Sequence, residues 1–238
     1  MLLFGQNLQT YFTCVSQPIK TGPFLENITW QKLRLSYNSK LNFHSHISEM
    51  RRNCFHQLKR FNSIRRFVPQ DQFAILIHAF ITSRIDFCNS IFYSLPENLV
   101  SRVQTIQNSC AKCLTRVNRF ATATEARITL HWLPSRARSR FKILVFAHKV
   151  VHLPNSVPHY ISAPFSTRDH GRTTRFNVSN TLKCDFKRRL LTVGGRSLNH
   201  TLPSVWNSLP QELRDIQSFS SFKSSLKTFL FWVSYPEV

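Results

Sequence analysis

The 238-residue chain contains few acids and few glycines. Eleven Asp and Glu residues stand against 32 Lys and Arg residues, which gives a formal net charge of +21. A charge of this sign and size favours a phosphate-rich partner. The five glycines, together with apolar residues spaced mostly three and four apart, predict a mainly helical protein. A hydrophobic content of 42%, with 21 Phe, suffices for a core and excludes a disordered chain.

The sequence lacks the motifs of most catalytic sites. Adjacent carboxylates of the kind that hold two metal ions in polymerases and nucleases do not occur. A P-loop is also missing, because Gly194 and Gly195 are followed by Arg196. Glu212 and Asp215 are three residues apart at a predicted helix start, where capping explains them better than metal binding. We therefore expect no catalytic residues, no metal, no cofactor and no small-molecule substrate.

Two pairs of residues have the spacing of metal ligands but lack further ligands. Cys110 and Cys113 form a CxxC within the apolar stripe of a predicted helix, which favours core packing. His148 and His152 are four apart on a predicted helix, with no acid or third ligand nearby. Neither pair predicts a metal site.

Signals for secretion and for a membrane span are also missing. The start MLLFGQNLQTYF has no basic residue before its interrupted apolar run, and the run FAILIHAFI at 73–81 is too short to cross a bilayer. The six cysteines are scattered without a disulfide framework. These features predict an intracellular protein, nuclear or cytoplasmic, that is not secreted and has no membrane partner.

Apolar periodicity predicts the positions of the helices in a multi-helix bundle. A helix over 44–66 should bury Ile47, Met50, Cys54, Leu58 and Phe61. A second should begin near Pro69 and use Phe73, Ile77, Phe80 and Phe87. Others should begin near Pro96 and Pro134, end near Trp206 and cover 220–233. The predicted domains are an irregular segment (1–40), a helical domain (41–164) and a basic loop or weak-strand linker with C-terminal helices (165–238).

A short motif occurs twice: YSLPENL at 93–99 returns as NSLPQEL at 207–213, each time after a large aromatic residue, Phe92 or Trp206. A proline suits the first helical turn, a polar residue before it can cap, and an acid after it complements the helix N-terminus. Both copies therefore predict helix starts. The first is followed by an apolar stripe, the SLPENL stripe: Leu99, Val103, Ile106, Cys110, Cys113 and Val117.

Clusters of cations are the best candidates for a functional site. The helix over 44–66 carries a basic face without an acid between Glu49 and Asp71, and a later segment, 168–189, mixes cations with aromatics. Such cations can bind the phosphates of a nucleic acid without contacting its bases. The simpler alternative is that they only form a solvated surface. The candidates are Arg51, Arg52, Lys59, Arg60, Arg65 and Arg66 on the first helix, Arg136, Arg138 and Arg140 at the open end of the helix after Pro134, and Arg172, Arg175, Lys187, Arg188 and Arg189 in the later segment.

Four blocks of sequence carry a resemblance to a known family. They are AFITSRIDFCNSIFYSLPENLVSRVQTIQNSCAKCLTR, LHWLPSRARSRFKILVFAHKVVH, SVWNSLPQELRD and SFSSFKSSLKTFLF. Together they resemble the C-terminal part of the RNA-directed DNA polymerase of non-LTR retrotransposons, of the LINE class and jockey-like. The resemblance implies the thumb and post-thumb regions, which grip template and primer, with residues 1–40 as a remnant of the palm end. The catalytic aspartates of this family lie upstream, in the palm.

Three functional hypotheses follow. The first is a reverse-transcriptase fragment that binds RNA or DNA non-specifically and is not itself an enzyme. The second is a helical interaction module that binds a protein, or a second copy of the chain, through the SLPENL stripe. The third is a decayed retroelement relic without function.

Overall fold

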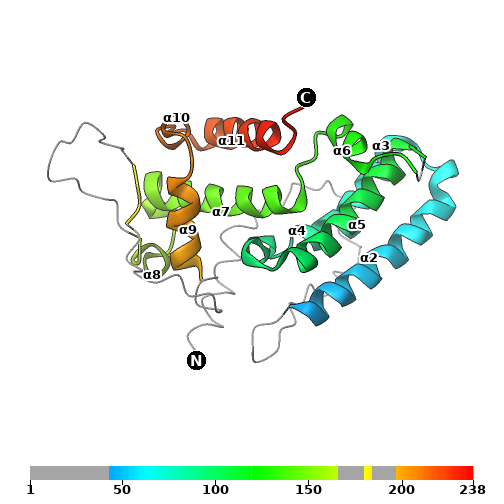
Figure 1. The fold of residues 1–238 in the computed structure, drawn as a ribbon, viewed down its shortest axis with the longest axis horizontal. Helices are drawn as coiled ribbons and strands as arrows, with labels where there is room; N and C mark the ends of the chain where they lie inside the picture. The colour runs from blue at the N-terminus through cyan, green and yellow to red at the C-terminus, as the bar shows by residue number, and fades with distance from the viewer. Residues whose placement is uncertain (1–42, 119, 166–179, 184–196, 238) are drawn as a thin grey trace, which may run out of the picture. The chain divides into compact units, whose positions relative to one another are not determined.

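The computed structural model describes residues 43–118, 120–165, 180–183 and 197–237. These residues form ten α-helices with short 3-10 and π-helical turns and contain no strand, as Figure 1 shows. The predicted fold class, a mainly helical multi-helix protein, is thereby confirmed. The predictions for segment 1–40 and for most of the basic linker concern residues outside the described ranges.

The chain divides into two compact units. Of the described residues, the α2–α6 unit contains those between 43 and 141 and between 227 and 237, and the α8–α10 unit contains those between 142 and 226. The division at 141/142 falls inside the helix over 135–152, and the division at 226/227 falls inside the helix over 219–234. The domain boundaries drawn from the sequence, after residues 40 and 164, stay predictions.

Helix α2 (His44–Ile64) forms one wall of the core of the α2–α6 unit. It buries the five predicted residues and no others: Ile47, Met50, Cys54, Leu58 and Phe61. Each fully buried aliphatic side chain of this kind stabilises the fold by about 1.5–3 kcal/mol. The helix ends two residues earlier than predicted, at Ile64, and the 3-10 turn η2 (Arg65–Phe67) follows.

The next helical stretch is interrupted, which corrects the predicted face. It consists of α3 (Gln70–Ile77), the π-helical turn η3 (His78–Thr82) and α4 (Ser83–Asp86). Its buried residues are Phe73, Ile77, Ile81 and Ile85, whereas the predicted Phe80 and Phe87 are only half-buried. A π-turn takes one extra residue, so a strict spacing of four stays on one face across it.

Helix α5 (Glu97–Thr115), which follows the 3-10 turn η4 (Asn89–Ser94), buries the SLPENL stripe as predicted, except at its end. Val117 lies beyond the helix and is 36% exposed. The cause is Arg116, the C-cap residue, whose left-handed φ of 56° ends the helix at Thr115.

The doubled motif opens α5 and α10 (Gln211–Arg214), so both predicted helix starts are confirmed. Pro96 and Pro210 are themselves the N-cap residues, with nearly identical dihedral angles (φ −55°, ψ 147° and φ −54°, ψ 146°). This corrects the expectation that the prolines lie in the first turn. At the N-cap the proline needs no donor, and its carbonyl accepts from the helix, as in the 3.0 Å bond from Leu99 N to Pro96 O. The preceding aromatics, Phe92 and Trp206, are both buried.

The α8–α10 unit is built around Trp206, which is fully buried at the end of α9 (Leu198–Asn207). Its ring lies 5.9 Å from that of Phe222 on α11 (Phe219–Ser234), and its Nε1 donates to Asn180 O at 2.7 Å. The helix ending near Trp206 and the final helix were both predicted. The remaining helices are α6 (Ala123–Thr129), α7 (Ser135–His152) and α8 (His159–Ser162), with the 3-10 turn η5 (Pro154–Ser156) between the last two.

Candidate nucleic-acid interface

The outward face of α2 and η2 presents most of the predicted cations to solvent. Five of the six are exposed: Arg51, Arg52, Lys59, Arg60 and Arg66. Within the described residues none of these five forms an ion pair with a carboxylate. Arg52 and Lys59, seven residues apart, lie on one line along the helix. Since burial of the opposite face fixes how α2 is rotated, the fold itself determines that these charges point outward.

The sixth cation, Arg65, has a partly structural role. Its side chain is half-buried, and its charge acts on the thiol of Cys113 in α5. Burial raises the pKa of that thiol, and Arg65 opposes part of the rise. The Cys113 thiol also donates to Asn62 Oδ1 at 2.9 Å, so the end of α2 is held against the end of α5.

A cation that the sequence did not suggest joins the α2 surface from α5. Arg102 Nη1 donates to Ser48 Oγ at 3.2 Å and lies 3.2 Å from His44 Nε2. It therefore adds a positive charge beside the first turns of α2. Only its position on the flank of the SLPENL stripe could have indicated this, because its partners lie more than fifty residues away in sequence.

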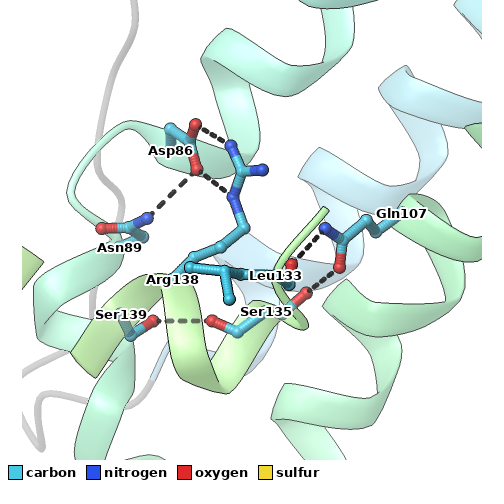
Figure 2. Close-up of polar contacts among 7 residues, drawn as sticks. All are labelled: Asp86, Asn89, Gln107, Leu133, Ser135, Arg138 and Ser139. Atoms are coloured by element: carbon cyan, nitrogen blue, oxygen red, sulfur yellow. Dashed lines mark hydrogen bonds and ion pairs between the residues drawn. The ribbon is translucent and has the colours of Figure 1, made fainter. Parts of the chain in front are cut away.

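Arg138 was predicted to project from the open end of α7, but the structure pairs it inside the fold. Its guanidinium forms a two-point ion pair with Asp86 of α4, with Nε donating to Oδ1 at 2.9 Å and Nη2 donating to Oδ2 (Figure 2). The two side chains are 20% and 27% exposed. Asn89 Nδ2 also donates to Asp86 Oδ1, at 3.1 Å. A cation whose fork is occupied by a carboxylate is not available for phosphate, so Arg138 leaves the candidate interface.

The same cluster fixes the start of α7. Gln107 on α5 donates through Nε2 to Leu133 O at 2.7 Å and accepts from Ser135 Oγ at 3.2 Å (Figure 2). Gln104 Oε1 accepts from the backbone N–H of Ser135 at 2.8 Å. The Gln104 amide thus satisfies one of the N–H groups that a helix N-terminus leaves unpaired, and Gln107 binds the Leu133 carbonyl just before the helix. The start of α7 is therefore packed against α5 and is not the open end that the sequence suggested.

The other two cations of α7 are also less available than predicted. Arg136 Nη2 lies 2.5 Å from Glu97 Oε2, although both side chains are largely exposed. Arg140 is half-buried. The remaining candidates, Arg172, Arg175, Lys187, Arg188 and Arg189, lie outside the described residues.

The ion pair also perturbs a neighbouring histidine. Burial lowers the pKa of His78 on η3, Arg138 lowers it further, and Asp86 opposes the change. The His78 ring lies 5.5 Å from that of Trp132 in an edge-on contact.

The two cysteines of the CxxC lie in the core, as predicted. Burial raises the pKa of Cys110, and the nearby thiols of Cys54 and Cys113 raise it further. A thiol that stays protonated in this way is a poor metal ligand and a poor nucleophile.

His148 and His152 are used for packing and backbone hydrogen bonds. Their Nε2 atoms lie 2.7 Å from Ile216 O and 2.8 Å from Arg214 O, respectively, and each must be the donor because a carbonyl only accepts. Burial lowers the pKa of His148, whose ring stacks 4.2 Å from that of Phe222. Asp215 accepts a 2.9 Å hydrogen bond from Asn180 Nδ2. Throughout the described ranges, no group of three or more metal-binding side chains comes together.

Comparisons with known proteins leave the origin of the chain open. No family model matches it, and no curated protein or solved structure gives a significant match. Among the helices that the structure describes, none combines the length and the apolar composition needed to cross a membrane. The retrotransposon resemblance therefore stays a prediction.

Proposed function

We propose that the chain binds RNA or DNA non-specifically through phosphate contacts from the exposed cations of α2 and η2. We propose further that it derives from the thumb and post-thumb part of a non-LTR retrotransposon reverse transcriptase. The sequence blocks quoted above support the origin. The cationic face of α2 supports the binding.

The carrying observation is the contrast between the cations of α2 and those of α7. On α7, Arg136 and Arg138 are matched to Glu97 and Asp86. On α2, the exposed cations have no such partners in the described residues, and Glu49 is the only acid of the helix. Uncompensated cations on one rigid face raise the local potential and attract a polyanion.

The burial of the SLPENL stripe argues against the second hypothesis, a docking surface on this stripe. Five of its six residues are buried within the chain, and α5 forms the centre of the core. An apolar surface already covered by the same chain cannot also receive a partner without unfolding. We therefore do not propose this surface for self-association.

The main experiment removes three cations of α2 together, Arg52, Lys59 and Arg60, each replaced by Gln. Affinity for mixed-sequence single-stranded RNA is then measured by filter binding from low to moderate salt. Each phosphate contact contributes about 0.7 to the slope of log K against log salt for single strands, so we expect the slope to flatten by about two. Weakening should be similar for unrelated sequences, because backbone contacts carry no base information.

A matched control removes the same charge elsewhere. Lys183, Lys223 and Lys227 are exposed and lie outside α2, and all three are changed to Gln. The control should bind more tightly than the α2 variant and keep most of the original slope. Equal losses in both variants would show that net charge alone, and not the α2 face, drives binding.

We also propose that the chain has no polymerase activity, because the sequence contains no adjacent carboxylates to hold a metal pair. Primer extension with magnesium or manganese tests this point. Extension above background by the purified chain would refute it.

The relic hypothesis is tested by cooperativity. A chain that keeps its core should melt in a sharp transition seen by circular dichroism, since Ile106, Leu144 and Phe222 are fully buried. A broad, non-cooperative loss of helix would favour a decayed relic over the binding function.

A further inference from the structure

The turn after α2 exposes a large aromatic ring that the fold does not need. Phe67, the last residue of η2, is 74% exposed. A phenylalanine contributes to stability by burying its surface, and this one buries little. It lies outside the apolar stripe of α2 and directly follows two arginines, Arg65 and Arg66. This sequence signal could have identified it.

The position of η2 is fixed from both sides by α5. Before the turn, Asn62 Oδ1 accepts from the Cys113 thiol at 2.9 Å. After the turn, Gln70 Nε2 donates to Leu114 O at 3.5 Å. Within the α2–α6 unit the end of α2, the start of α3 and the end of α5 thus meet at one corner, which Figure 1 also shows. We call this the α2–α3 corner: residues 62–70 with 112–117.

A positive charge lies close to the exposed ring. The guanidinium carbon of Arg66 lies 5.0 Å from the centre of the Phe67 ring, which is a cation–π distance. The corner also contains Arg65 and the exposed Arg116, and the nearest acid in sequence is Asp71, in the first turn of α3. An exposed aromatic ring set among arginines offers both a stacking face and phosphate contacts.

We infer that the α2–α3 corner binds single-stranded nucleic acid by stacking an unpaired base on Phe67. This inference rests on the proposed function and adds that the strand is single. Duplex bases are already stacked on one another, whereas unpaired bases stack on exposed aromatic side chains. Arg66, next to the ring, and Arg116, at the end of α5 in the same corner, are the cations that we assign to phosphate contacts. The charge excess favours this polyanion over an apolar protein surface.

The test compares two replacements of Phe67 in the full chain. Phe67→Leu keeps an apolar side chain but removes the aromatic face, and Phe67→Trp enlarges that face. Affinity is measured for single-stranded RNA and DNA, for an abasic single strand of equal length, and for a duplex. Both variants should fold normally, since the side chain is exposed, and thermal melting by circular dichroism confirms it.

We expect Phe67→Leu to bind base-containing single strands about fivefold or more weakly, and Phe67→Trp to bind at least as well as the parent. The abasic strand should bind the parent more weakly than the base-containing strand and should not distinguish the three proteins. The salt slope should be unchanged, because no phosphate contact is removed. Ile75→Ala is the control: Ile75 is 56% exposed on α3 and has no ring, so its loss should leave affinity unchanged.

Two results would overturn the inference. If Phe67→Leu binds as well as the parent, no base stacks on the ring, and an apolar contact with a protein becomes the better explanation. If the abasic strand or the duplex binds as tightly as the base-containing single strand, recognition involves phosphates alone. In the latter case a steep salt slope would still support the proposed function, whereas a flat slope would remove both.

Discussion

The ion pair between Asp86 and Arg138 should be a main stabilising contact of the α2–α6 unit. We consider Asp86→Ala, which removes three hydrogen bonds at once, two from Arg138 and one from Asn89. A hydrogen bond to a charged group contributes about 1.5–3 kcal/mol when water is excluded, and less when it is not. With the two charged side chains 20% and 27% exposed and Asn89 buried, we expect a loss of about 2–4 kcal/mol.

The exposed ion pair between Arg136, also on α7, and Glu97 provides the comparison. Arg136 and Glu97 are 51% and 75% exposed, so breaking this pair should change stability by less than about 1 kcal/mol. Urea unfolding followed by circular dichroism measures both changes. For a chain of this length the Asp86 variant should melt about 5–15 °C lower, and the Glu97 variant only slightly lower.

Double-mutant cycles separate the pairs from their surroundings. Alanine replacements at Asp86 and Arg138, singly and together, should give a coupling energy of about 1–3 kcal/mol. The cycle for Glu97 and Arg136 should give less than about 0.5 kcal/mol. If the first coupling is no larger than the second, the reasoning from burial and two-point geometry is wrong. A folded Arg138→Ala variant should also keep its affinity for nucleic acid, since that side chain lies outside the proposed interface.

Three further predictions concern the core, pH and thiol chemistry. Ile106→Asp and Leu144→Asp should each abolish cooperative melting, because both sites are fully buried and an unpaired carboxylate there costs several kcal/mol, on the order of the whole stability. Burial lowers the pKa of His148 below its ordinary 6.5, so the unfolded chain binds the proton first and the free energy of unfolding falls as the pH drops below 6.5. His148→Gln should weaken this pH dependence in urea unfolding. Some of the dependence should remain, because the pKa values of His46 and His78 shift in the same direction. Burial raises the pKa of four cysteines, that of Cys54 to about 11. Alkylation mapped by mass spectrometry should therefore be slow in the native chain and fast in the unfolded chain at Cys54, Cys88, Cys110 and Cys113. Rapid labelling of the native chain at these positions would contradict the assigned core.

The sequence predicted those features that are determined by residues close together in the chain. The rotation of α2 followed from five apolar residues that lie within one helix, and the structure confirms all of them. In the second helical stretch the π-turn at His78–Thr82 placed Ile81 and Ile85 in the core. The predicted Phe80 is only partly buried, although it packs against the core, and Phe87 is also half-buried. Nothing in the three-and-four spacing of that segment marks a turn with an extra residue.

The candidate site shows the same contrast. The sequence identified the cations of α2, whose outward direction is set by the helix that carries them. It also placed Arg136 and Arg138 at a phosphate site, although their partners Glu97 and Asp86 lie 39 and 52 residues away. Pairings over such distances leave no periodic pattern.

The sequence alone determined the helical class, the positions of α2, α5, α9 and α11, and the excess of positive charge, because propensity, apolar period and composition act over a few residues. The tertiary structure decided which cations remain available for a partner. The chain has only eleven acids. Each carboxylate that the fold places beside an arginine neutralises its charge, and that arginine is then no longer available to bind phosphate. Asp86 and Glu97 do this on α7, and within the described residues no acid does so for the exposed cations of α2.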